Sequence, residues 1–169
     1  MNEKVSALLN DQINKEFYSA YLYLDLSNYY TSIGLDGFAN WYDVQAKEEM
    51  SHARMMYQYL HDNGVRPELL AIAKPDKEIN NIKDPVMIGL EHEKYVTSLI
   101  HNIYAAAAEA NDYLTMEFMH YFVKEQGEEE KNANDLVNKM ELYGSDPRSL
   151  YLLDQELAAR VFVAPTTAE

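Results

Sequence analysis

The chain has 169 residues, 47% of them hydrophobic, with six Gly, five Pro and no Cys, and a formal net charge of −14. This length suits one domain with a substantial core, and the composition excludes a disordered chain. Because there is no cysteine, disulfides and thiolate metal sites are excluded, which fits a cytoplasmic protein. The negative charge argues against nucleic-acid binding. We expect neither a signal peptide nor a membrane partner, since no apolar run is long enough for either.

The residue pattern predicts four long helices and one short one, delimited by glycines at helix ends and by prolines. The first begins at Asn2 or Asn10, and the helices end or begin near Gly34, Asp36, Gly64, Pro85, Asp112, Gly144 and Pro147. The segment 65–85 carries three Pro and no sustained helical stripe, so we interpret it as a crossover along the bundle. It makes the second and third helices parallel.

The predicted fold is therefore all-α, a four-helix bundle with one long crossover connection and a short C-terminal fifth helix. A single domain, 1–169, would contain the bundle at about 3–143, the fifth helix at about 147–162 and a flexible tail at 163–169. The sustained 3.6-residue period supports this class.

A carboxylate interrupts the apolar stripe of each long helix. Steps of three and four residues trace one face of a helix, and they bring the following residues onto the inward faces: Glu16, Glu49, His52, Glu93 and Glu129. Inward carboxylates repel each other and each costs several kcal/mol in lost hydration unless compensated. A pair of cations would compensate for them. Four carboxylates and one imidazole are the donor set of a non-haem di-iron centre.

Each of these residues also has a simpler interpretation when taken alone. A single inward Glu such as Glu16 or Glu93 can have its carboxylate in water, since buried Glu is rare unless paired. A Glu-x-x-His match such as Glu49 and His52 occurs often by chance. Four interruptions at matching depth, one on each helix, are hard to assign to chance, so we favour the metal centre.

Two further features allow alternative interpretations. Tyr23 lies on the same face as Glu16, either as a core residue or with its hydroxyl hydrogen-bonded beside the metal. The acidic run 124–131 is either a solvated face or part of a second, looser carboxylate site, whose members would be Glu48, Glu125, Glu128 and Glu129. Gly127 within this helix costs up to about 1 kcal/mol relative to Ala, and no pattern explains it.

On five motifs the chain resembles the bacterial non-haem ferritins, over essentially its whole length. The motifs are LNDQINKEFYSAYLY (9–23), KEEMSHARMMYQYL (47–60), EHEKYVTSLI (91–100), FMHYFVKEQGEEEK (118–131) and GSDPRSLYLLDQEL (144–157). The resemblance implies a homo-oligomeric cage of twenty-four subunits. Such a cage oxidises Fe(II) with dioxygen or peroxide and stores the product as a ferric mineral.

The resemblance also implies a role for each candidate residue. Glu16, Glu49 and His52 match the first iron position, and Glu49 is the bridge between the two irons. The second position is completed by Glu93 and Glu129, with Gln126 close by. A third iron site matches Glu48, Glu125, Glu128 and Glu129, and Tyr23 matches the tyrosine beside the centre.

Several departures and competing families bear on this interpretation. A bacterioferritin would repeat Glu-x-x-His on the fourth helix, where this chain has Gln126 and Glu129, so haem is not expected although Met50 matches the haem-binding methionine. Gly127 and Tyr121 stand where relatives often carry His and Trp.

The alternatives are a haem-binding bacterioferritin, a soluble di-iron oxidase or peroxidase of rubrerythrin type, a metal-free helical scaffold and a DNA-protecting mini-ferritin. The missing Cys-rich module and basic tail argue against the rubrerythrin and the mini-ferritin.

Overall fold

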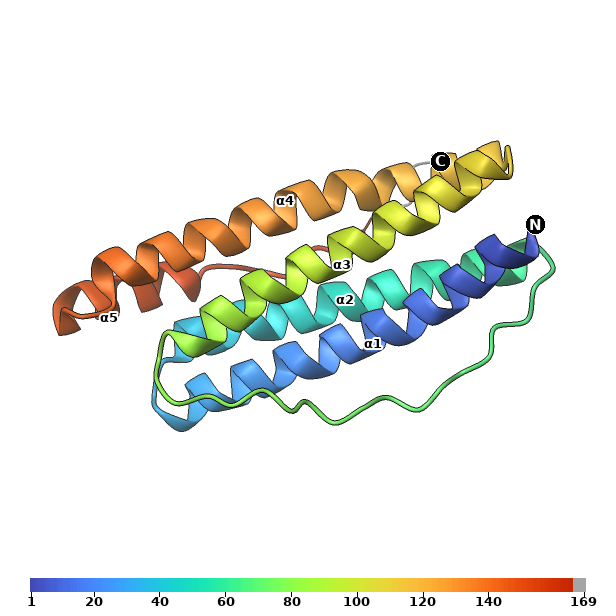
Figure 1. The fold of residues 1–169 in the computed structure, drawn as a ribbon. Coiled ribbons are helices and arrows are strands. Elements are labelled where there is room, and N and C mark those ends of the chain that lie inside the picture. Colours follow the sequence, from blue (N-terminus) through green and yellow to red (C-terminus); the bar gives the residue numbers. More distant parts are fainter. Residues whose placement is uncertain (166–169) are drawn as a thin grey trace.

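Five helices and no strand make up the described part of the chain, residues 1–165, in the computed structural model (Figure 1). The helices are α1 (Glu3–Ser32), α2 (Asp36–Asp62), α3 (Asp84–Glu109), α4 (Tyr113–Tyr143) and α5 (Pro147–Leu157). The predicted all-α class with four long helices and a short fifth one is confirmed. Of the two possible starts of the first helix, Asn2 is right, because its side chain accepts hydrogen bonds from the backbone N–H groups of Lys4 and Val5.

The predicted end of the fifth helix is wrong by several residues. We expected it near residue 162, whereas α5 ends at Leu157. The reason is a tertiary contact: the Asn40 side-chain amide donates to the carbonyl oxygens of Leu157 and Arg160, at 3.2 and 2.9 Å. The Leu157 carbonyl oxygen also accepts from the Arg160 N–H in a closing turn at 3.2 Å, and Asn40 holds the chain where it leaves the helical path. Of the tail predicted at 163–169, residues 163–165 are non-helical and residues 166–169 lie outside the described part.

The connection between α2 and α3 runs along the length of the bundle (Figure 1), as expected for a crossover. Two asparagines of α1 hold it in place. Asn10 forms a reciprocal pair with the backbone of Glu68, at 2.7 and 3.2 Å, and Asn14 donates to the carbonyl oxygen of Ala71 at 3.1 Å. Because the crossover returns the chain to the same end, α2 and α3 run parallel.

Polar residues divide the core of the bundle into two apolar clusters. One cluster contains Leu22, Leu26 and Phe38, and the other contains Leu9, Met56 and Ile100. On each long helix, buried polar residues separate the members of the two clusters: Glu16, Glu49, His52, Glu93, Gln126 and Glu129. The apolar clusters therefore position a polar layer that spans all four long helices.

The short helix α5 docks onto the beginning of α2. Asp154 accepts hydrogen bonds from the backbone N–H groups of Gly37 and Phe38, at 2.8 and 3.0 Å, and so caps the N-terminus of α2. A Cβ atom at Gly37 would lie 1.6 Å from the Asp154 carbonyl oxygen, so only glycine permits this approach. None of the helices in residues 1–165 combines the length and hydropathy that crossing a membrane requires.

Candidate metal centre

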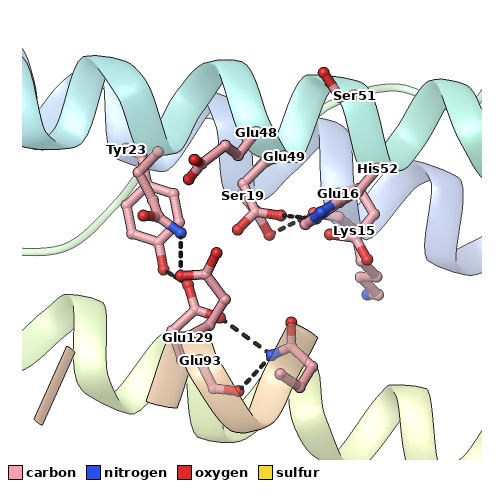
Figure 2. A network of polar contacts seen from close by, with 12 residues as sticks. Lys15, Glu16, Ser19, Tyr23, Glu48, Glu49, Ser51, His52, Glu93 and Glu129 are labelled. Atoms are coloured by element: carbon pink, nitrogen blue, oxygen red, sulfur yellow. Dashed lines mark hydrogen bonds and ion pairs between the residues drawn. The ribbon is translucent and has the colours of Figure 1, made fainter. Parts of the chain in front are cut away.

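One group of metal-ligating side chains lies between α1 and α2. Glu16 on α1 and Glu49 and His52 on α2 each offer one ligand atom, and these atoms lie within 4.8 Å of one another (Figure 2). All three residues are at most 3% exposed. The Nδ1 atom of His52 is 3.4 Å from a carboxylate oxygen of Glu49. In the described part of the chain, no other His, Asp or Glu residues form such a group.

The carboxylate of Glu16 is only half satisfied. Its Oε1 atom accepts a hydrogen bond from Gln12 Nε2 at 2.8 Å. Its Oε2 atom has no hydrogen-bond partner. Within residues 1–165, it is the only buried side-chain nitrogen or oxygen atom without one. A buried carboxylate oxygen without a partner is costly. A cation bound between Glu16, Glu49 and His52 would remove this cost, so the orphaned oxygen favours a metal site.

The facing helices contribute a second pair of carboxylates, Glu93 on α3 and Glu129 on α4 (Figure 2). Glu93 accepts hydrogen bonds from the Tyr23 hydroxyl and, at 3.1 Å, from Gln126 Nε2. Glu129 accepts a bond from Gln45 Nε2 at 2.7 Å. Both side chains are buried, and hydrogen bonds from neighbouring helices fix their orientation. Four helices thus direct carboxylates to one interior region.

These carboxylates perturb each other's protonation. Burial, followed by the charge of Glu49, raises the pKa of Glu16 well above its usual value, and burial followed by the charge of Glu93 does the same to Glu49. Burial and the charge of Glu129 raise the pKa of Glu93 to about 8. The metal-free site therefore retains protons at neutral pH, and binding of a cation would release them.

The four residues of the predicted third site have different environments. Glu48 is half-buried, and its carboxylate is paired with the guanidinium of Arg160. Burial raises the pKa of Glu48, and the neighbouring charge of Arg160 opposes this rise. Glu128, in contrast, is exposed on α4. Glu129 is buried and Glu125 is partly buried, so the third site with these four residues stays a prediction.

Comparison with known proteins agrees with this arrangement. The family described as Ferritin-like domain matches residues 6–143. The chain belongs to the ferritin family. It is 37% identical to the bacterial non-haem ferritin of Staphylococcus haemolyticus, over 91% of this chain and 93% of that protein. It is 38% identical to a bacterial non-haem ferritin-like protein of Haemophilus influenzae, over 93% of this chain and 95% of that protein.

A solved structure described as a novel open-pore ferritin, from the archaeon Archaeoglobus fulgidus, superimposes with a TM-score of 0.92. Its sequence is 42% identical, and the match covers 95% of this chain and 99% of that chain. The predicted resemblance to the bacterial non-haem ferritins is therefore confirmed, and it supports a role in iron storage.

The structure locates the three positions at which departures or a haem ligand were considered, Tyr121, Gly127 and Met50. Tyr121 places its ring edge-on to the His52 ring, with the centroids 6.1 Å apart. Gly127 is exposed, and a Cβ atom there would meet nothing within 4 Å. Met50 is 44% exposed on the outer side of α2. Nothing in the packing explains why glycine occupies position 127.

Three residues that the sequence analysis did not single out as site residues are part of this polar layer: Gln12, Gln45 and Arg160. Gln12 and Gln45 precede Glu16 and Glu49 by four residues, so the helical period could have placed them on the same faces. Arg160 follows the last helix and is far from the acids in sequence, so no periodic signal points to it.

Proposed function

We propose that this ferritin stores iron and is a ferroxidase, with Fe(II) as the substrate of a di-iron centre inside each subunit. The observation that carries the proposal is the buried group of Glu16, Glu49 and His52, with one Glu16 oxygen lacking any partner. Oxygen-rich sites with one imidazole suit iron. A purely structural polar layer would leave no such oxygen unsatisfied.

In the proposed centre, Glu16 and His52 bind the first Fe(II), Glu49 bridges, and Glu93 with Glu129 binds the second. Each Fe(II) gives up one electron, so two ions reduce one dioxygen to peroxide, or one peroxide to water. Hard carboxylate oxygens stabilise Fe(III) more than Fe(II), and this favours oxidation. Reduction of dioxygen to hydrogen peroxide consumes two protons, and these come from solvent because metal binding has already displaced the protons of the carboxylates.

Gln126 would set the charge at the second iron position. Its amide is neutral and donates to Glu93 and, at 3.3 Å, to Thr97 Oγ1. A neutral group here leaves this position with less negative charge than a third carboxylate would supply. Weaker binding of Fe(III) then allows the product to move on towards the mineral.

Storage requires an enclosed space, and we propose that the subunits assemble into a homo-oligomeric cage, with twenty-four subunits as the family resemblance implies. Support comes from the related Archaeoglobus fulgidus structures, which are described as open-pore and closed forms of a ferritin. The net charge of −14 would attract Fe(II) and retain ferric ions while the mineral nucleates.

The test is an anaerobic titration with Fe(II), followed by addition of oxygen. We expect ferric product, followed by absorbance, to form much faster than in buffer, and the particle in solution to have the size of a cage. Glu49→Gln should bring the rate close to the spontaneous one, because the bridging ligand is lost. Glu117→Gln, which removes the same charge at an exposed position of α4, serves as the control. A monomer or dimer that leaves the oxidation rate unchanged would overturn the proposal.

A further inference from the structure

The guanidinium group of Arg160 lies against the acidic side of the metal centre. It donates to Gln45 Oε1 at 2.8 Å and to the carboxylate of Glu48, and it stacks over the Trp41 ring at 4.2 Å from the centroid. The side chain is only 17% exposed. A planar guanidinium with several fixed donors is suited to hold two acceptors at once, which an ammonium group cannot do in the same geometry.

Through Gln45 the arginine is connected to a proposed iron ligand. The Gln45 amide accepts from Arg160 through its oxygen and donates through its nitrogen to Glu129 at 2.7 Å. Arg160 therefore fixes the orientation of the amide that fixes Glu129. The same guanidinium forms an ion pair with the carboxylate of Glu48, a residue of the predicted third iron site.

The position of Arg160 is imposed by the docking of α5. Asp154 ties α5 to the start of α2, and Asn40 on α2 donates to the Arg160 carbonyl oxygen at 2.9 Å. These contacts hold the backbone before and after Leu157, where the chain stops being helical. Consequently the guanidinium reaches α2 at Trp41, Gln45 and Glu48, four and three residues apart on one face.

We propose that Arg160 is a positioning residue which acts as the resident cation of this acidic site. A metal ion can use Glu48 only when the guanidinium leaves, and its departure removes the side-chain contacts of Arg160 with α2, while Asn40 still holds the backbone. The inference rests on the proposed function, because it takes Glu48 and Glu129 as ligands of a further metal ion. Binding of iron at this further position is thereby coupled to loosening of the C-terminal segment 158–165.

The test uses Co(II), bound without oxygen to the assembled protein and measured by equilibrium dialysis. We expect the intact protein to bind ions tightly at the centre and one further ion more weakly. Arg160→Gln should tighten the further ion by about tenfold, since a competing partly buried ion pair is lost. Arg66→Gln removes the same charge from an exposed position in the crossover and should leave this affinity unchanged.

Two further variants separate the specific pairing from a general effect of charge. Arg160→Lys keeps the charge but cannot hold Gln45 and Glu48 together, so a smaller gain in affinity is expected. Adding Glu48→Gln to Arg160→Gln should abolish the gain, because the freed ligand is gone. These comparisons are made between variants with the same melting temperature and particle size, so a folding defect is recognised.

A second readout follows the C-terminal segment itself. In the intact protein, hydrogen exchange of the backbone amides in 158–165 should increase as the further Co(II) binds. The inference fails if Arg160→Gln binds the further ion as the intact protein does, or if exchange stays constant on loading. If the intact protein holds no tight Co(II) at all, the proposed function fails instead.

Discussion

The hydroxyl group of Tyr23 on α1 donates a hydrogen bond to the carboxylate of Glu93 on α3. Both side chains are 1% exposed, and the Tyr23 ring stacks on the Tyr42 ring with the centroids 5.7 Å apart. Tyr23 is thus a core residue and a partner of a proposed iron ligand at the same time. The sequence left open whether Tyr23 is a core residue or a hydrogen-bond donor beside the site. Its ring packs in the core and its hydroxyl is the donor.

Replacing Tyr23 by Phe should weaken the second metal position and leave the first intact. The ring keeps its packing, while Glu93 loses one of its two side-chain donors, at a cost of about 1–2 kcal/mol in the free energy of unfolding. Metal binding by dialysis should show a several-fold weaker second ion. The matched control is Tyr42→Phe, which loses only a bond to the Pro85 carbonyl oxygen. Equal effects of both variants on the second ion would contradict the assignment.

The stability of the metal-free protein should fall as the pH rises from about 4.5 to about 8. Glu93 has a usual pKa of 4.5 and a folded pKa of about 8, so between these values the folded state binds more protons than the unfolded state. The free energy of unfolding then decreases with pH, by an amount on the order of a few kcal/mol. Thermal unfolding without metal measures this decrease.

In the same experiment Glu93→Gln should flatten the pH dependence, because its amide does not titrate. A bound divalent cation should restore stability mainly at the alkaline end, where the carboxylates are ionised and bind metal best. An unchanged pH slope in Glu93→Gln would show that Glu93 does not retain its proton.

Gln126→Glu should tighten metal binding and destabilise the metal-free protein. The new carboxylate would face Glu93, which now accepts a hydrogen bond from Gln126, so repulsion replaces attraction at a cost of roughly 1–3 kcal/mol. With metal, the added negative ligand should strengthen the second ion about tenfold. Gln155→Glu, on the exposed side of α5, controls for net charge and should change neither quantity. A second ion held no more tightly by Gln126→Glu would argue against this role.

Two glycine substitutions should have opposite effects on stability. Gly127→Ala adds a methyl group in open space on an exposed helical face, and it should stabilise by about 0.5–1 kcal/mol through helix propensity. Gly37→Ala would place its Cβ 1.6 Å from the Asp154 carbonyl oxygen. It should destabilise by more than about 2 kcal/mol, because α5 must move. Chemical denaturation compares the two, and a neutral Gly37→Ala would contradict the docking of α5.

The sequence by itself determined the helices and the faces that they bury. Periodicity is a local property, so it placed Glu16, Glu49 and Glu93 on inward faces, and all three are at most 1% exposed. It also predicted the crossover. The interior of α4 was predicted in the same way, and Gln126 and Glu129 are buried.

Only the tertiary structure decided which of these residues meet and what completes them. Glu48 was expected as a metal ligand, and the structure pairs it with Arg160, because the chain after α5 packs against α2. The end of α5 depends on Asn40, which is more than a hundred residues away in the chain. Contacts over such separations leave no periodic trace, since they arise when whole helices pack together.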